Sequence, residues 1–114
     1  MSSRGDAERL QDILEAIAAV ERYAIGINSE DDLLQDEKTL QAILYNLTII
    51  GEASDQLSEG MKAKSLSTDW RAIKGMRNLV THEYFRVKVK FVWGVIIKDL
   101  DALKSEIERM QRGG

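Results

Sequence analysis

Apolar residues recur at intervals of three and four along most of the chain, the spacing of one face of an α-helix. The pattern predicts four main helices over about residues 6–24, 36–57, 70–84 and 90–110, with a short extra helical turn near residues 29–34. There is no proline, which suits long uninterrupted helices. Four such helices with short connections predict an all-α fold, an antiparallel four-helix bundle formed by a single domain over residues 1–114.

Glycine and short polar residues mark where these helices begin and end. Gly26 ends the first helix, Ser29 caps the short turn, and Asp69 caps the helix that begins at Trp70. Residues 60–69 are expected to form a loop. Residues 87–93 alternate almost as in a strand, but a single strand would have no partner. We therefore expect a loop that leads into the last helix.

The helix over residues 36–57 carries two unusual features. Gly51 lies in its interior, where glycine costs roughly 1 kcal/mol relative to alanine. A glycine there predicts that another backbone comes close. Tyr45 and Ile49 lie partly off the main apolar stripe, so the apolar surface of this helix is wide. A surface of that width predicts contacts with more than one neighbour, or with a second protomer.

Composition excludes several classes of function. At 114 residues, 44% of them apolar, the chain can bury a core. It has no cysteine, which excludes disulfides, thiolate zinc sites and cysteine nucleophiles. With only one histidine as well, we expect no metal site and no cofactor. There is no membrane-spanning run and no signal-peptide pattern, so we expect a cytoplasmic protein that does not bind membranes.

Charge is distributed unevenly along the chain. The net charge of −3 combines a balance of −9 over residues 1–59, +7 over residues 60–98 and −1 over the rest. A local basic field attracts polyanions even on an acidic protein. Charge alone nevertheless favours the simpler interpretation, a solvated helix face.

The basic segment contains the residues with the most informative chemistry. His82, the only histidine, follows Arg77 by five residues and precedes Tyr84 by two. Arginine can hold a phosphate through two parallel hydrogen bonds, and histidine exchanges a proton near neutral pH. RNA can be cleaved without a metal when its own 2′-hydroxyl attacks the phosphate, because a base and a cation then suffice to start the reaction. The pair therefore predicts an RNA-cleaving site.

Spacing assigns supporting roles to the neighbours of this pair. On an α-helix, Arg77 and His82 would differ by about 140°, whereas Asn78 would share a face with His82. We expect Asn78 to orient the substrate or the imidazole. The basic residues expected to hold flanking phosphates are Lys74, Arg86 and Lys88. A reaction that needs both a base and an acid would use two histidines, and a two-fold homodimer would supply the second.

Structural interpretations of the same residues remain open. A lone histidine near a helix end more often caps a helix or packs in a core than acts as a catalyst. Arg77 would then pair with Glu52 or Asp55 on the preceding helix, and Tyr84 would be an ordinary amphipathic core residue. The acidic cluster of Asp31, Asp32, Asp36 and Glu37 lacks the spacing of a calcium loop and is interpreted as solvated charge.

These residues resemble the HepT-like toxins of the HEPN superfamily. Arg77, His82 and Tyr84 match the R-x4-H-x-Y signature of that family, and Asn78 matches the polar residue after its arginine. Residues 50–53 (IGEA), the run over residues 70–78, Trp93 and the pair at residues 99–100 extend the resemblance over nearly the whole chain.

The resemblance implies an all-helical homodimer with metal-independent ribonuclease activity. It implies that His82 and Arg77 are catalytic residues in a cleft between protomers. It also implies a partner, a minimal nucleotidyltransferase antitoxin that can transfer AMP to Tyr84. The alternative function is a non-catalytic nucleotide- or partner-binding subunit of a nucleotidyltransferase complex, in which Arg77 and His82 hold a nucleotide or a structural hydrogen bond.

Overall fold

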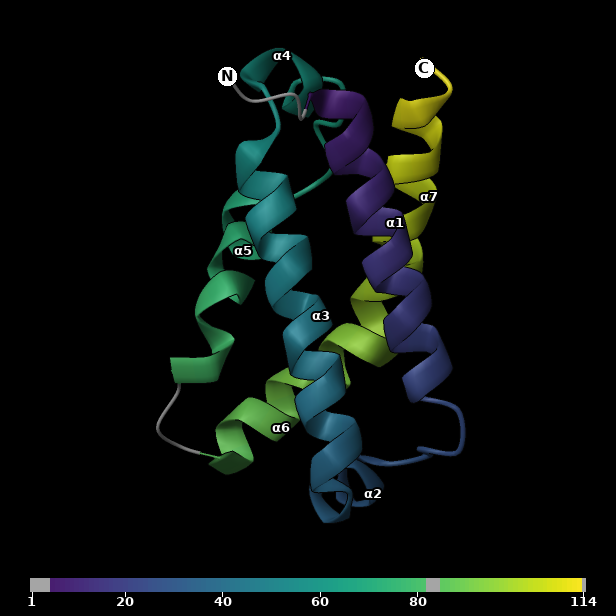
Figure 1. The fold of residues 1–114 in the computed structure, drawn as a ribbon, viewed down its shortest axis with the longest axis vertical. Coiled ribbons are helices and arrows are strands. Elements are labelled where there is room, and N and C mark those ends of the chain that lie inside the picture. The colour runs from purple at the N-terminus through teal and green to yellow at the C-terminus, as the bar shows by residue number, and fades with distance from the viewer. Residues whose placement is uncertain (1–4, 82–84, 114) are drawn as a thin grey trace.

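The structure, a computed structural model, describes residues 5–81 and 85–113, and every regular element within them is helical (Figure 1). The α-helices are α1 (Asp6–Tyr23), α2 (Glu30–Gln35), α3 (Glu37–Gln56), α4 (Glu59–Lys62), α5 (Trp70–Lys74), α6 (Phe85–Gly94) and α7 (Leu100–Gln111). A 3-10 helix, η1 (Gly75–Thr81), continues α5, and a π-helical turn, η2 (Val95–Asp99), joins α6 to α7. The predicted all-α class is confirmed for these residues.

Helix α3 is the centre of the arrangement. It packs against α1, α2, α5 and η1, while α1 also packs against α7. In Figure 1, α1 and the α5–η1 segment run downwards, whereas α3 and α7 run upwards. Most apolar positions at helical spacing are buried, among them Leu10, Ile13, Ile17, Leu40, Ile43, Leu44, Leu47, Ile50, Leu103 and Ile107.

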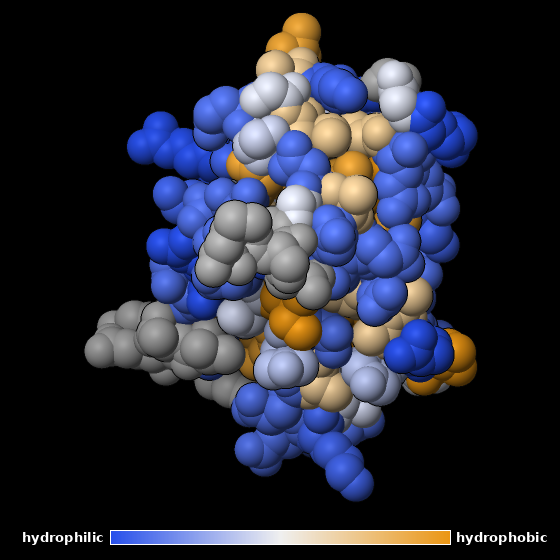
Figure 2. All heavy atoms as spheres, turned by 45° about the horizontal axis from the view of Figure 1, so that its top comes forward, coloured by the Kyte–Doolittle hydropathy of each residue, from blue (hydrophilic) through white to orange (hydrophobic). Residues whose placement is uncertain are grey.

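The outer surface is largely polar. Figure 2 shows one face of the molecule, on which apolar residues form small separate patches among polar ones. The large apolar side chains that remain exposed are Tyr23, Ile25, Tyr45, Leu66, Val87, Phe91 and Ile97. Within the described ranges, no helix combines the length and the apolar character needed to cross a membrane.

Side-chain caps fix the predicted helix starts. Ser29 Oγ accepts a hydrogen bond from the backbone N–H of Asp32 at 3.0 Å, and Asp69 Oδ1 accepts one from Ala72 at 3.0 Å. Asp36, predicted to open the long helix, is its cap instead. Gly26 adopts a left-handed φ of +88°, which ends the turn after α1 as predicted. The expected loop over residues 60–69 is wrong in part, because α4 occupies its start.

The predicted α-helix over residues 70–84 is wrong over residues 75–81, and residues 82–84 lie outside the described residues. From Gly75 to Thr81 the backbone tightens into a 3-10 helix. With 3.0 residues per turn, the buried pair Met76 and Leu79 stays on one face in such a helix. Apolar spacing of three residues fits both helix types, so the sequence pattern alone does not separate them.

The predicted loop before residue 90 is also wrong, since the chain is helical from Phe85 onwards. Val87 and Phe91 are 56% and 45% exposed, whereas Val89 and Val92 are buried. The exposed pair is four residues apart and the buried pair three, which are helical spacings. The apparent strand alternation over these residues is therefore explained by two faces of one helix. The helical run then bends at η2, where Figure 1 shows α6 crossing the lower end of the molecule before α7 rises.

The expected close approach at Gly51 is confirmed. A Cβ atom on this residue would lie 2.7 Å from the backbone nitrogen of Arg77 and 2.9 Å from the carbonyl oxygen of Ile73. Real Cβ atoms do not come this close to backbone atoms. The segment that carries Arg77 therefore rests on the backbone of α3, and only glycine permits this contact.

A polar cluster ties the chain that precedes α5 to α7. Glu106 accepts hydrogen bonds from Ser65 Oγ and from Arg109 Nη2, and Arg109 also donates to the carbonyl of Lys64 at 2.6 Å. The hydrogen bond from Arg109, followed by that from Ser65, lowers the pKa of Glu106 to about 2. The carboxylate is therefore ionised at neutral pH and holds both segments together.

The contact at Gly51 predicts that Gly51→Ala destabilises the protein. The new Cβ would meet backbone atoms, which cannot rotate away, so the cost lies at the upper end of the about 1–3 kcal/mol of overpacking. Alanine regains about 1 kcal/mol of helix propensity, so we expect a net loss of about 2 kcal/mol. Urea unfolding measures this. Gly94→Ala is the matched control, because Gly94 has helical φ and ψ of −60° and −41° and a Cβ there meets nothing within 4 Å. Equal stability of Gly51→Ala and wild type would contradict the prediction.

The Glu106 cluster predicts a specific pH dependence of stability. Because the folded-state pKa lies below the unfolded value, the carboxylate stabilises the fold above pH about 5 and loses this effect as pH falls towards 2. Wild type should therefore exceed Glu106→Gln in unfolding temperature at pH 7, and the difference should shrink with acidification. Thermal melts of both proteins at pH 7, 5, 4 and 3 measure this. A difference that is constant over that range would contradict the assigned pKa.

Candidate functional site

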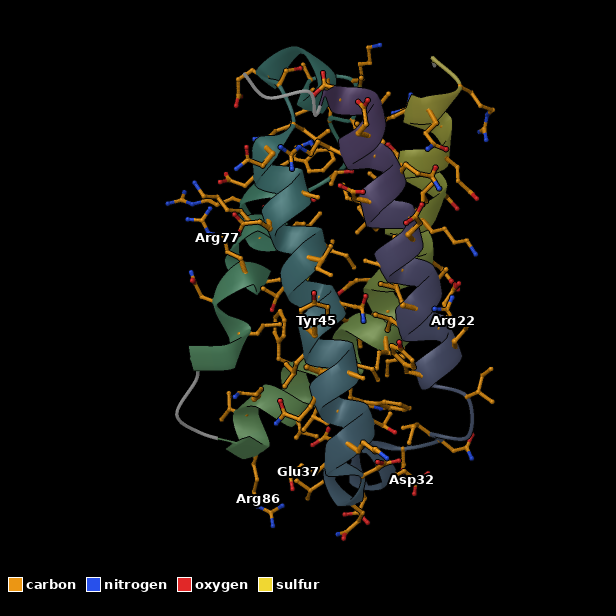
Figure 3. The ribbon with its side chains drawn as sticks, viewed as in Figure 1. Arg22, Asp32, Glu37, Tyr45, Arg77 and Arg86 are labelled. Carbon is orange, nitrogen blue, oxygen red and sulfur yellow. The ribbon has the colours of Figure 1, made fainter. Side chains whose placement is uncertain are left out.

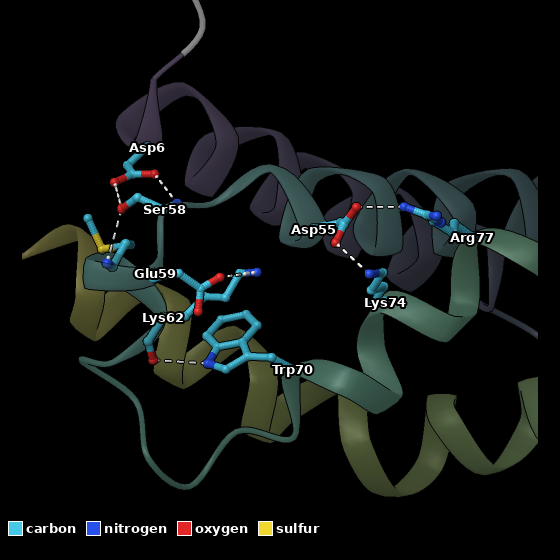
Figure 4. Close-up of polar contacts among 9 residues, drawn as sticks. Asp6, Asp55, Ser58, Glu59, Lys62, Trp70, Lys74 and Arg77 are labelled. Atoms are coloured by element: carbon cyan, nitrogen blue, oxygen red, sulfur yellow. Dashed lines mark hydrogen bonds and ion pairs between the residues drawn. The ribbon is translucent and has the colours of Figure 1, made fainter.

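Helix α3 positions Arg77 through two residues one turn apart on the same face. The backbone of η1 contacts Gly51 at Arg77. Four residues after Gly51, the carboxylate of Asp55 accepts a hydrogen bond from the Arg77 side chain. Arg77 Nη1 donates to Asp55 Oδ2 at 2.6 Å, and Lys74 Nζ lies 3.4 Å from Asp55 Oδ1 (Figure 4). Lys74 and Arg77 are three residues apart, which brings both side chains to one carboxylate.

The carboxylate in this cluster is ionised at neutral pH. Its partial burial raises the pKa of Asp55, but the hydrogen bond from Lys74 and the charges of Lys74 and Arg77 together outweigh that effect and lower the pKa. Asp55 therefore compensates one of two positive charges, which leaves this group of three side chains with a net charge of +1.

Exposure decides what this group can contact. The side chain of Asp55 is 21% exposed, compared with 34% for Arg77 and 53% for Lys74. The acid thus lies deeper than the two bases, and both cations remain accessible from solvent. A partly exposed arginine beside a lysine is an arrangement that can bind a phosphate, since guanidinium and ammonium groups are both positively charged.

The other predicted site residues lie at different places. Asn78 follows Arg77 on η1 and is exposed. Arg86 and Lys88 are on α6, and Figure 3 shows Arg86 well below Arg77 on the same side of the molecule. Arg86 lines a separate hollow of about 210 Å³ between α2 and α6. The structure therefore brings Lys74 to Arg77 but not Arg86.

His82 and Tyr84, the other two residues of the R-x4-H-x-Y signature, lie outside the described residues. Their predicted roles as base and modification site therefore stay predictions. The described part of the chain does place the arginine of the signature, as the third residue of a 3-10 helix that is fixed on α3 by Gly51.

The structural alternative for Arg77 is confirmed in one respect, since Asp55 is its partner. Sequence reasoning did not see that Lys74 shares this carboxylate. The signal was present in two spacings, four residues from Gly51 to Asp55 and three from Lys74 to Arg77. Sequence reasoning also missed an open groove of about 400 Å³ between α5, η2 and α7. Its lining residues include Ile73, Met76, Phe91, Val95 and Leu103.

Comparison with known proteins identifies the family of this all-helical chain. Residues 13–110 match the family described as ribonuclease HepT-like. The chain belongs to this family, which confirms the resemblance found in its sequence.

Individual relatives align over almost their full length. The chain is 35% identical over 109 residues to the "Probable ribonuclease HepT" of Thermococcus cleftensis, covering 96% of this chain and 98% of that one. It is 31% identical over 101 residues to a "Putative RNase" of Caldanaerobacter subterraneus subsp. tengcongensis, covering 89% of each. A "Putative RNase" of Methanocaldococcus jannaschii is 29% identical over 108 residues, covering 95% and 98%. No solved structure gives a significant match.

Proposed function

We propose that this protein is a metal-independent endoribonuclease, the toxin of a toxin–antitoxin system. The observation that carries the proposal is the alignment of nearly the whole chain with the Thermococcus cleftensis protein named as a ribonuclease. The R-x4-H-x-Y signature at Arg77, His82 and Tyr84 supports it, as does the accessible pair of cations at Arg77 and Lys74.

The proposed reaction uses the 2′-hydroxyl of RNA as nucleophile. His82 takes the 2′ proton, the 2′ oxygen bonds to phosphorus, and the bond from phosphorus to the 5′ oxygen breaks. The products are a 2′,3′-cyclic phosphate and a 5′-hydroxyl that has taken a proton from an acid. Arg77 stabilises the additional negative charge of the phosphorane, and Asn78 orients the substrate or the imidazole. Lys74 binds the same or the next phosphate, and Arg86 and Lys88 bind phosphates further along the strand.

A homodimer completes this site in our proposal. Each protomer is an antiparallel four-helix bundle with one histidine, and a two-fold axis brings a second imidazole into the cleft as the acid. The wide apolar surface of α3 supports such a contact, because Tyr45 on this helix is 66% exposed.

The proposed regulator is a minimal nucleotidyltransferase that acts as antitoxin. Transfer of AMP to Tyr84 would add negative charge and bulk next to a site that must bind the phosphates of RNA. Such a modification would repel the substrate from the cations at Arg77 and Lys74.

One observation favours the alternative, a non-catalytic subunit of a nucleotidyltransferase complex. Arg77 is already paired with Asp55, and a paired arginine can be purely structural. The two functions differ in a single measurable respect, the appearance of new RNA ends.

Cleavage of RNA by the purified protein tests the proposal. With total RNA and EDTA, wild type should produce fragments that end in 2′,3′-cyclic phosphate. His82→Ala should lower the rate about 10²–10⁴-fold and Arg77→Ala about 10²–10³-fold. Arg22→Ala is the control for loss of one positive charge, since Figure 3 shows Arg22 on α1, away from Arg77. Absence of cyclic-phosphate ends from wild-type reactions would favour the non-catalytic subunit.

The dimeric site predicts that activity depends on protein concentration. Specific activity should fall when the protein is diluted below the dissociation constant of the dimer, because each protomer alone lacks the second histidine. Analytical ultracentrifugation gives that constant, and cleavage assays over the same concentrations give the activity. A monomer that cleaves RNA with full specific activity would rule out the shared site.

A further inference from the structure

We propose that Asp55 is a positioning residue for Arg77, which fixes the guanidinium for phosphate binding and catalysis. The proposal rests on the ribonuclease function proposed above and adds a residue outside the R-x4-H-x-Y signature. Asp55 itself contacts neither the substrate nor the reacting atoms in this proposal. It acts through the side chain of Arg77.

The first argument is the rigidity of the framework that carries both residues. Asp55 lies in the last turn of α3, a helix of 20 residues whose inner face is buried in the core. Arg77 is held on the same face by the backbone contact at Gly51. The Cα positions of acid and base are therefore set by packing, and the short aspartate side chain adds only two torsions. A hydrogen bond of 2.6 Å across this framework fixes the direction of an otherwise flexible arginine.

The second argument concerns which edge of the guanidinium remains available. Asp55 accepts from Nη1 of Arg77. An arginine held at Nη1 keeps the edge formed by Nε and Nη2, which is one of the two edges that bind a phosphate through parallel hydrogen bonds. The other carboxylate oxygen of Asp55 is occupied by Lys74, so the acid separates the two cations and sets their relative direction.

The third argument is that removal of the Asp55 charge has opposite effects on RNA binding and on catalysis. Removal of the Asp55 charge raises the net charge of the group from +1 to +2, which strengthens attraction of RNA. It also frees Arg77 to adopt other rotamers, which weakens stabilisation of the phosphorane. A positioning role therefore predicts that kcat falls while KM stays constant or falls. Loss of folded protein would lower kcat as well, but it would not lower KM.

Steady-state cleavage of a short RNA by Asp55→Asn, with the full-length protein, tests this proposal. Asparagine keeps the size of the side chain and an acceptor oxygen but not the charge. We expect kcat about tenfold below wild type, a KM that does not rise, and partial recovery of kcat in Asp55→Glu. In the Arg77→Lys background, Asp55→Asn should have no further effect on kcat, because the side chain that it positions is absent.

Glu37→Gln is the matched control, since it removes one negative charge from the far end of the same helix (Figure 3). Glu37 lies about 27 Å from Asp55 along α3, beyond the screening length at 0.1 M salt. This variant should keep the kcat of wild type. Thermal melts of every variant give the folded fraction, by which each kcat is corrected.

The outcomes separate this proposal from the proposed function. If wild type cleaves RNA and Asp55→Asn cleaves it with the same kcat, the positioning role is overturned and the ribonuclease function stands. An equal loss of kcat on Asp55→Asn in the wild-type and Arg77→Lys backgrounds also overturns it, because Asp55 then does not act through Arg77. If wild type yields no cyclic-phosphate ends, both proposals fall.

Discussion

The contact between the backbone of η1 and the backbone of α3 at Gly51 is the constraint on which the site depends. Helix axes in proteins usually lie 8–10 Å apart because side chains separate them. Here a single missing Cβ lets Arg77 N and Ile73 O reach the surface of α3 itself. This packing offsets the cost of a glycine inside a helix. It also fixes the position of Arg77 along α3.

The chemistry follows from the register of that contact. Once Arg77 lies over Gly51, the next residue of α3 on the same face is Asp55, and the previous residue of the α5–η1 segment on the same face is Lys74. One carboxylate therefore meets two cations without any long loop or flexible arm. A shift of one residue in either helix would place a different side chain opposite the arginine.

Long, strongly periodic helices were predictable from the sequence, as α1 and α3 illustrate by starting and ending within one residue of expectation. Gly51 was informative because glycine destabilises the interior of a helix, so its presence there predicts a compensating contact. The η1 segment was not predictable, because Met76 and Leu79 are three residues apart in either helix type. The choice between Glu52 and Asp55 as partner of Arg77 was open for a related reason. The two acids differ by only about 60° around α3. The backbone contact of Arg77 with Gly51 favours Asp55, which lies about 40° from Gly51 around the helix, compared with about 100° for Glu52.

Asp55 also bears on the choice between a structural and a functional Arg77. A partly exposed ion pair stabilises a protein only slightly, and one base would already satisfy one acid. The structure instead gathers two bases around a single acid, on a chain whose overall charge is negative. The second cation adds little to folding, because repulsion between the two cations offsets much of its attraction to Asp55. It does suit the binding of an anion, so the ion pair with Asp55 is compatible with a phosphate-binding role and gives Arg77 the fixed direction that such a role requires.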